Sequence, residues 1–458
     1  MKHLPVTQDA PLWREIAYGD PALMAERLRG HAQLLFLDSA KHDQALGRYS
    51  YIACDPFASF AVDAKETGQA ALARLDRLLD LWRLPSIAGL PPFQGGFAGY
   101  FAYEFGRLLE PQIMANTPAP RIPPAMLHAY DAVIAFDHET RRAFIVSTGL
   151  PETTQQNRIA RARDRLAEIE TLLQRDPPPR GSHRITGFAS NFDRPRYEDA
   201  IRRTIDLILA GDIFQANIAQ TFTADIPQGF DSFSYYDALR RVNPATFGAW
   251  LDFGDVVIAS SSPERLLSFD GTMAEARPIK GTRPRDADPR KDAALKAELL
   301  ASRKDRAENV MIVDLLRNDL SRVCDPGSVQ VPVLCGLETY ASVHHLTSVV
   351  TGRLARNRTR GDLIAACFPG GSITGAPKIR AQEIIAEMEE SPRDVYCGSI
   401  GFLGFNGTMD LNIAIRTVLF HDGKARLQGG GGITARSDPA EEYDETLAKV
   451  RNILRAGT

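Results

Sequence analysis

The chain has 458 residues, of which 44% are hydrophobic and 24% are charged, and its formal net charge is −3. This composition is typical of a soluble globular protein, and the small negative charge argues against a general nucleic-acid binder, which needs a basic surplus. Charged and polar residues interrupt every candidate spanning stretch. We therefore expect no membrane segment and no secretory leader, and we predict a cytoplasmic protein.

Short strand patterns dominate the beginning of the chain, at residues 34–38, 97–106, 131–137 and 143–149. A charged run at 155–175 repeats leucine and isoleucine at helical spacing, which predicts a helix. The proline-rich segment 176–184 suits neither a helix nor a central strand. We therefore predict an N-terminal part (1–175) that shares sheets with the rest, a linker, and a catalytic part (185–458).

The catalytic part alternates helix and strand patterns. Helices are predicted at 196–211, 289–306, 308–323, 361–368, 376–388 and 439–455, and strands at 256–261, 265–269, 272–279, 398–405, 409–420 and 424–431. Hairpin signals mixed with helices indicate an α+β fold, a large single domain of mostly antiparallel sheets packed with helices. The five dispersed cysteines lack C-x-x-C spacing, which predicts reduced thiols in a core.

A lysine stands among arginines in ARPIKGTRPR (276–285). An Asp-Gly turn at 270–271 predicts a hairpin in which Glu264 faces Arg277. Lys280 then lies roughly 10 Å further along the strand at 3.3 Å per residue, on the opposite face unless a bulge re-aims it. From these residues alone, a cross-strand ion pair and a catalytic acid–lysine pair both stay open.

The helix predicted at 439–455 begins with a cap and a proline, and it places Glu442, Glu445 and Lys449 on one face. Two glutamates on one face suit a hard cation such as Mg²⁺, and a solvated face with a Glu445–Lys449 pair is the structural alternative. The glycine run at 429–433 leaves backbone N–H groups bare ahead of this helix. It predicts an anion site or, more simply, a tight turn.

Two further motifs are less specific. The loop PGGSITGAPK (369–378) resembles a phosphate loop, but neither it nor the glycine run has dinucleotide or ATP-binding spacing. The adjacent His344 and His345 alternate faces if they lie on a strand, so only one of them can face a given site.

Together these motifs resemble the chorismate-utilising enzyme family over nearly the whole chain. The matching stretches include FLDSA, GRYSYIACDP, GGFAGYFAYEFGR, GDIFQANIAQTF, SSPERLLSF, RPIKGTRPR, ENVMIVDLLRNDLSRV, VHHLTSVVTG, FPGGSITGAPKIRAQEII, YCGSIGF, MDLNIAIRT and GGGGITARSDPAEEYDETLAK. So many motifs in one order are highly specific. The resemblance implies that chorismate is the substrate and Mg²⁺ the cofactor.

Lys280 resembles the lysine of those members that aminate chorismate at C4, whereas anthranilate and salicylate synthases carry alanine there. The resemblance implies that Lys280 attacks C2 as the C4 hydroxyl leaves, and that ammonia then enters at C4. Glu264 would protonate the leaving hydroxyl, and His345 matches the active-site histidine. Neutralising a free lysine at pH 7 costs about 4.6 kcal/mol, and we expect Arg277, Arg283 and a dry pocket to lower this cost.

The same resemblance implies the remaining ligands. Glu308 and Glu442 match the Mg²⁺ ligands that hold the ring carboxylate, and Glu445 matches a nearby or water-mediated ligand. The enolpyruvyl carboxylate is held by Tyr396, Arg416, Gly430, Gly431 and Gly432. Ser372 or Thr374 supplies a hydroxyl, and Lys449 is a further substrate contact.

The chain also departs from the family. Ser39 in FLDSA resembles the tryptophan-binding element, but the companion NPxPY loop reads NPATF at 243–247, which puts tryptophan binding in doubt. Arg436 stands where the family usually has aspartate. No glutamine amidotransferase signature and no fused lyase occur, so we expect a separate amidotransferase subunit to supply ammonia and a separate aminodeoxychorismate lyase to act downstream.

Three alternative functions stay open. Anthranilate synthase component I would aminate C2 and eliminate pyruvate, and isochorismate synthase would need a lysine at another position to activate water. A non-catalytic regulatory paralogue is the alternative of another class. The intact set of Glu264, Lys280, Glu308 and Glu442 argues against that paralogue.

Overall fold

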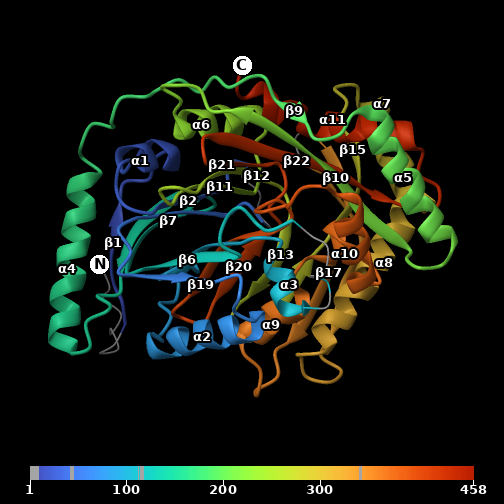
Figure 1. Ribbon diagram of the computed structural model, residues 1–458. Coiled ribbons are helices and arrows are strands. Elements are labelled where there is room, and N and C mark those ends of the chain that lie inside the picture. Colours follow the sequence, from blue (N-terminus) through green and yellow to red (C-terminus); the bar gives the residue numbers. More distant parts are fainter. Residues whose placement is uncertain (1–9, 42–45, 112, 114–117, 340–342) are drawn as a thin grey trace.

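The computed structural model describes residues 10–41, 46–111, 113, 118–339 and 343–458 (Figure 1). The first nine residues, part of the stretch in which we expect no leader, lie outside the described ranges. The helices are α1 (Pro21–Arg27), α2 (Gly68–Leu81), α3 (Phe105–Leu109), α4 (Gln155–Leu172), α5 (Arg194–Leu209), α6 (Ser232–Val242), α7 (Pro289–Ala301), α8 (Arg303–Ser321), α9 (Arg360–Cys367), the 3-10 helix η2 (Gly371–Ile373), α10 (Lys378–Met388) and α11 (Pro439–Arg455). No helix within these ranges is long and apolar enough to cross a bilayer.

The strands form two large sheets. Their bounds are β1 (Leu12–Ile16), β2 (Leu34–Asp38), β3 (Tyr49–Ala53), β4 (Ala58–Ala61), β5 (Gly96–Phe101), β6 (Ala125–Tyr130), β7 (Ala132–Asp137), β8 (Arg142–Ser147), β9 (Ala189–Ser190), β10 (Gln215–Asp225), β11 (Phe247–Asp252), β12 (Val257–Ser262), β13 (Arg265–Phe269), β14 (Met273–Arg277), β15 (Ile279–Pro284), β16 (Gln330–Thr339), β17 (Val343–Arg353), β18 (Gly375–Ala376), β19 (Ser399–Gly404), β20 (Met409–Asn412), β21 (Thr417–His421) and β22 (Lys424–Ile433).

Neighbouring strands in both sheets run antiparallel. One sheet has the order β1-β8-β7-β3-β2-β11-β12-β21-β22-β10-β18, with β9 beside β10. The other has the order β15-β17-β14-β13-β20-β19-β5-β6-β4, with β16 beside β17. Strands from before and after the linker meet in each sheet, where β2 pairs with β11 and β5 pairs with β19.

The sheets pack face to face and helices cover their outer faces. Along β2, Leu35 points into a core shared with Tyr100 and Phe402 of the other sheet, while Phe36 faces α6 at Tyr236. This alternation follows from the two-residue period of a strand. The prediction of an α+β fold of mostly antiparallel sheets packed with helices is confirmed.

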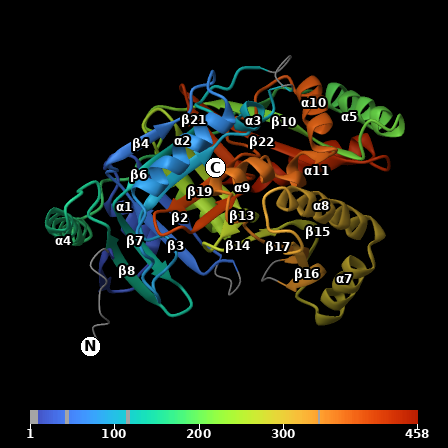
Figure 2. The same ribbon diagram turned by 90° about the horizontal axis from the view of Figure 1, so that it is seen from below.

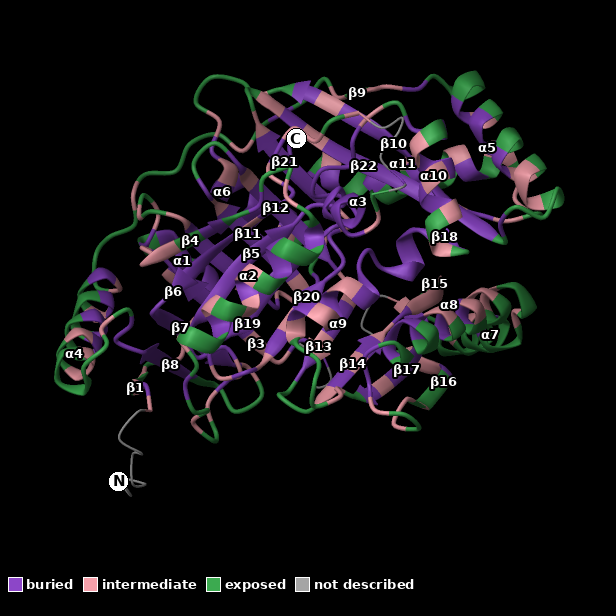
Figure 3. Cartoon of the chain, turned by 60° about the horizontal axis from the view of Figure 1, so that its bottom comes forward, coloured by how far each residue is buried: buried purple, intermediate pink, exposed green. Residues whose placement is uncertain are grey.

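Figure 3 shows that the buried residues follow the strands and the inner faces of most helices. Helix α7 is an exception, because Leu299 is its one buried residue. In two perpendicular views α4 and α7 lie at opposite ends of the molecule (Figure 2). All five cysteines are buried and unpaired, as expected.

The turn before Lys280 is shifted by one residue from the prediction. The Asp270 N–H donates to the carbonyl of Met273 over 3.2 Å, and the Met273 N–H donates to the Asp270 carboxylate over 2.7 Å. The turn residues are therefore Gly271 and Thr272. Gly271 has φ +100, which suits the first position of a type II′ turn.

The pairing of the two hairpin strands also differs from the prediction. After a bulge in β13, Arg265 faces Arg277, so the predicted pairing of Glu264 with Arg277 is wrong. A second irregularity lies in β15, between the pairs Ile279–Thr347 and Thr282–His345, and it contains Lys280. A bulge does re-aim this segment.

One predicted helix is too long. The pattern at 289–306 breaks at Ser302, whose side chain accepts the Asp305 N–H and caps α8. Helix α8 therefore begins about a turn earlier than the predicted helix at 308–323, and Glu308 lies inside it rather than at its start.

Candidate active site

A cavity of about 160 Å³ lies where η2, β15, β22 and α11 meet. Its walls include most residues predicted for substrate and catalysis, namely Glu264, Lys280, Ser372, Tyr396, Arg416, Gly430, Gly431, Gly432 and Lys449. These residues come from segments up to 185 positions apart (264 to 449). The fold therefore brings together groups that no local pattern relates.

Glu264 is buried between β12 and β13 beside the cavity. The Ser372 hydroxyl donates a 2.8 Å hydrogen bond to its Oε1 atom. Burial raises the pKa of Glu264 above its usual value, although this hydrogen bond and the charge of Lys280 oppose the rise. A carboxyl group in this setting can carry a proton into a reaction and act as a general acid.

Lys280 reaches the same serine from the opposite wall. Its Nζ atom donates to the backbone carbonyl of Ser372 over 3.2 Å. Burial lowers the pKa of Lys280, and the nearby carboxylates of Glu308 and Glu264 counteract part of this effect. Ser372 thus contacts both groups, which places a buried carboxyl group and an amine with a lowered pKa in one cavity.

The prediction that Arg277 and Arg283 lower the cost of deprotonating Lys280 is wrong. Arg277 pairs with Glu338 over 2.7 Å, and Arg283 pairs with Glu298 over 2.7 Å. Carboxylates therefore balance both guanidinium charges. The lowered pKa of Lys280 comes chiefly from burial, with Lys449 as a like-charged neighbour.

Three carboxylates gather beside the cavity from two helices. Glu308 lies on α8, and Glu442 and Glu445 lie one turn apart on α11. Burial raises the pKa of both Glu308 and Glu442, and the charge of Glu445 raises each further. Burial would also raise the pKa of Glu445, but Lys449, 2.7 Å away, and other lysines bring it below its usual value.

The carboxylates suit Mg²⁺ in chemistry but do not form a closed cage. Among the described residues, one group of three has its ligand atoms all within 4.8 Å of each other, and it is His31, Cys54 and Asp55. Mg²⁺ commonly takes one or two carboxylates and keeps several waters. Glu308 and Glu442 as direct ligands, with a substrate oxygen and water, therefore fit better than three direct glutamates.

The glycine run lies in strand β22, which extends the strand predicted at 424–431 to Ile433, so the tight-turn alternative is wrong. Ala219 and Asn217, opposite Gly430 and Gly432, direct their N–H groups away from β22. In an antiparallel ladder Gly430 and Gly432 must then direct theirs away from β10. Strand β21 pairs with β22 only as far as Leu427, so this edge opens into the cavity. Bare amides for an anion are thus available at a strand edge.

A guanidinium completes this anion-binding wall. Arg416 lines the cavity and makes no side-chain hydrogen bond within the described part of the chain. Burial lowers its pKa, and the charge of Glu264 opposes this. At Gly431 an added Cβ would lie 2.6 Å from Glu442 Oε2, so glycine lets the carboxylate approach the strand.

The two histidines face different neighbours. His344 Nε2 lies 3.0 Å from the Asp292 carboxylate, whereas His345 Nδ1 lies 2.8 Å from the Thr282 hydroxyl. Burial lowers the pKa of His345 to about 4, and Arg416 is among the cations that lower it further. His345 is therefore neutral at pH 7 and lies beside the cavity rather than among its lining residues.

The choice between the two hydroxyls favours Ser372. Ser372 lines the cavity, whereas the Thr374 hydroxyl donates to the carbonyl of Gly370 over 2.9 Å and is fully buried. Thr374 therefore acts on the shape of the loop rather than on a ligand.

Comparison with known proteins identifies the family of the chain. Residues 32–455 match the family described as chorismate binding enzyme. The chain belongs to the chorismate-binding enzyme family. It is 38% identical over 439 residues to aminodeoxychorismate synthase component 1 of Salmonella typhimurium, covering 92% of each chain. It is also 38% identical over 434 residues to anthranilate synthase component 1 of Streptomyces coelicolor, covering 92% of this chain and 83% of that relative.

The fold agrees as well. The crystal structure of anthranilate synthase component I from Streptococcus pneumoniae superposes with a TM-score of 0.78 at 30% identity, covering 96% of this chain and 99% of that one. The protein is therefore a chorismate-utilising enzyme, but relatives of two activities are equally similar, so identity alone does not choose between them.

The family resemblance did not single out two polar side chains in the cavity wall. Asn217 and Gln428 are buried, and each has a side-chain oxygen with no hydrogen-bond partner in the described structure. A polar residue inside the buried strand β10, and another directly before the glycine run, were the available signals. Both oxygens can accept hydrogen bonds from a ligand.

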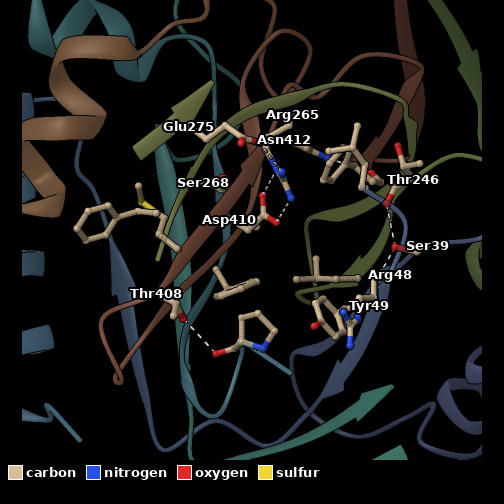
Figure 4. Close-up of a pocket in the computed structure, with 18 of the residues that line it drawn as sticks. Ser39, Arg48, Tyr49, Thr246, Arg265, Ser268, Glu275, Thr408, Asp410 and Asn412 are labelled. Atoms are coloured by element: carbon tan, nitrogen blue, oxygen red, sulfur yellow. Dashed lines mark hydrogen bonds and ion pairs between the residues drawn. The ribbon is translucent and has the colours of Figure 1, made fainter. Parts of the chain in front are cut away.

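A larger cavity, of about 590 Å³, lies elsewhere between the two sheets and contains Ser39 (Figure 4). The Ser39 hydroxyl donates to the backbone carbonyls of Tyr49 over 2.7 Å and Thr246 over 2.9 Å. Arg265 crosses this cavity and forms a bidentate pair with Asp410. The residues predicted to be catalytic, Glu264 and Lys280, lie in the smaller cavity, so size does not identify the candidate active site. Tryptophan binding at Ser39 stays a prediction.

Proposed function

We propose that this protein is an aminodeoxychorismate synthase component I, which converts chorismate and ammonia to 4-amino-4-deoxychorismate. The observation that carries the proposal is Lys280, a lysine with a lowered pKa in the same cavity as a buried acid. Relatives named aminodeoxychorismate synthase component 1 support it. The product would serve 4-aminobenzoate and folate synthesis.

The proposed reaction has two substitutions. The neutral amine of Lys280 attacks C2 of the ring as both ring double bonds shift, and the C4 hydroxyl leaves as water with a proton from Glu264. Ammonia then forms a bond to C4, both double bonds shift back, and the C2–nitrogen bond breaks to release Lys280. One ammonia is consumed and one water is released, so atoms balance.

Other groups hold the substrate in this scheme. Arg416, Tyr396 and the amides of Gly430 and Gly432 bind the enolpyruvyl carboxylate, whose negative charge matches this wall. Mg²⁺, if held by Glu308 and Glu442, would neutralise the ring carboxylate. We also propose a partner glutamine amidotransferase subunit as the ammonia source and a separate lyase for the product.

Anthranilate synthase component I is the second candidate, because relatives with that name are equally similar. That enzyme would aminate C2 and release pyruvate, and the family's members of this kind carry alanine at the position of Lys280. A lysine nucleophile at C2 would occupy the atom that ammonia must attack. This conflict favours the first candidate.

A product assay on the purified chain tests the proposal. The chain is mixed with chorismate, Mg²⁺ and an ammonium salt at mildly alkaline pH, and products are identified by mass-resolved chromatography. We expect 4-amino-4-deoxychorismate, which an added lyase converts to 4-aminobenzoate. Anthranilate together with pyruvate would reject the proposal and leave the second candidate.

A further inference from the structure

A buried ion pair lies behind the small cavity. Glu389 caps the C-terminus of α10, and Arg393 follows it by four residues. The guanidinium makes a bidentate contact, with Nη2 2.7 Å from Glu389 Oε1 and Nε 2.9 Å from Oε2. Arg393 is only 3% exposed and Glu389 7%. Such a pair costs desolvation, so stability alone is a weak reason for its presence.

The other donors of Arg393 hold two separate walls of the cavity. Its Nη2 atom donates to the carbonyl of Asn217 on β10 over 2.6 Å, and Nη1 donates to the carbonyl of Ile373 on η2 over 3.1 Å. The guanidinium also lies 5.8 Å from the ring centre of Tyr396. Asn217, Ile373 and Tyr396 all line the cavity.

Glu389 holds the same strand at a second point. Its Oε1 atom accepts the N–H of Ala219 over 2.7 Å. The pair therefore fixes β10 at Asn217 and at Ala219, directly opposite Gly432 and Gly430 in β22. Ser372, which contacts both Glu264 and Lys280, is the residue before Ile373. A shift of this ion pair would therefore move both Ser372 and the edge of β22 at Gly430 and Gly432.

We propose that Arg393, oriented by Glu389, is a positioning residue that sets the distance between η2 and β10. It thereby aligns Glu264 and Lys280 with the backbone amides of Gly430 and Gly432. The role depends on the planar fork of arginine. Lysine has three donors on one atom and cannot contact Glu389 twice while reaching two carbonyls on different elements. The role in catalysis rests on the proposed function, but the geometric role does not.

Four variants test the proposal, with chorismate turnover and local hydrogen exchange as readouts. Arg393→Met and Arg393→Lys remove the fork, and Arg393→Met with Glu389→Met removes the pair without leaving a buried charge. Arg165→Met is the matched control, because Arg165 is a buried arginine that pairs with Asp131 and does not line the cavity.

We expect kcat of Arg393→Met to fall about 10- to 100-fold, and by more than KM rises, because small misplacements of reacting groups have effects of this size. Exchange should quicken in residues 215–220 and 371–376, and Arg393→Lys should not restore either property. The double variant should regain much of the thermal stability while kcat stays low. Arg165→Met should lose stability without this loss of kcat.

Two results would overturn the proposal. One is recovery of kcat in the double variant, which would make Arg393 a matter of stability alone. The other is unchanged exchange in both segments of Arg393→Met. If the wild-type chain does not turn over chorismate, the proposed function fails, but the exchange comparison still decides whether the pair holds η2 and β10 together.

Discussion

Replacement of Lys280 with alanine tests whether this side chain acts as a nucleophile or only as a structural charge. A free lysine is neutral at pH 7 only at a cost of about 4.6 kcal/mol, and burial of Lys280 lowers its pKa and removes part of that cost. The chain thus holds an amine that is easier to deprotonate than one in water. If this amine forms the covalent intermediate, its loss should reduce kcat for 4-amino-4-deoxychorismate by about 10⁴-fold or more, which is about 5.4 kcal/mol of barrier.

The fold should tolerate this variant. Lys280 makes one hydrogen bond, to the Ser372 carbonyl, and no ion pair within 4.0 Å is found for it in the described chain. The midpoint temperature of thermal unfolding should therefore change little. Lys296→Ala is a matched control, because Lys296 is an exposed lysine on the neighbouring helix α7. It should retain wild-type activity.

Two assays check the prediction. Steady-state product formation is followed by mass-resolved chromatography with chorismate, Mg²⁺ and an ammonium salt. The intact protein is also incubated with chorismate and Mg²⁺ without ammonia, and the wild type should gain the mass of chorismate minus water at Lys280. Wild-type product formation by Lys280→Ala, or an adduct on another residue, would refute the nucleophile role.

Two other predictions concern this site, and a third concerns His128, a buried histidine on strand β6. Glu264→Gln should lower kcat by about 10²- to 10⁴-fold and remove the alkaline limb of the pH–rate profile. The reason is that a carboxyl group with a raised pKa loses its proton as pH rises and can then no longer act as the acid. An unchanged alkaline limb would point to another acid. EDTA should abolish turnover and Mg²⁺ restore it, and Glu308→Gln or Glu442→Gln should raise the Mg²⁺ concentration for half-maximal activity; indifference to EDTA would exclude this metal role. Burial lowers the pKa of His128 from 6.5 to about 4. Its depressed folded-state pKa means that stability is lost as pH falls from about 6.5 to 4. In urea titrations the wild type should therefore lose on the order of 3 kcal/mol more than His128→Gln over that range, and equal losses would contradict this.

Much of the fold could be predicted because local signals agreed with the tertiary structure. Strand 265–269 and helix 439–455 have the predicted bounds, the first from its apolar run after Glu264 and the second from its cap and proline. The pattern at 97–106 predicted a single strand, but aromatic residues are compatible with both strands and helices. It divides into strand β5 and helix α3. Where several states fit the same side chains, packing decides.

The site could be predicted only as a set of residues, not as a geometry. The motifs identified Glu264, Lys280 and the two alternatives Ser372 and Thr374. The contact of Ser372 with Glu264 and Lys280 depends on segments about 100 residues apart. The strand pattern at 424–431 includes Gly429 to Gly431, but the side on which the glycine amides are bare follows only from the pairing of β22 with β10. No local pattern in the sequence marked the role of Arg393, whose partners Asn217 and Ile373 are distant in the chain.

The ion pairs of the neighbouring arginines show which effect lowers the pKa of Lys280. Arg277 and Arg283 lie three residues to either side of Lys280, yet their charges are paired with Glu338 and Glu298. Paired charges create little net field at a third site, so they cannot be what lowers the pKa of the amine. Burial does so instead, and burial depends on the walls that exclude water. The lowered pKa of Lys280 is therefore a property of the packed cavity rather than of its basic neighbours in the sequence.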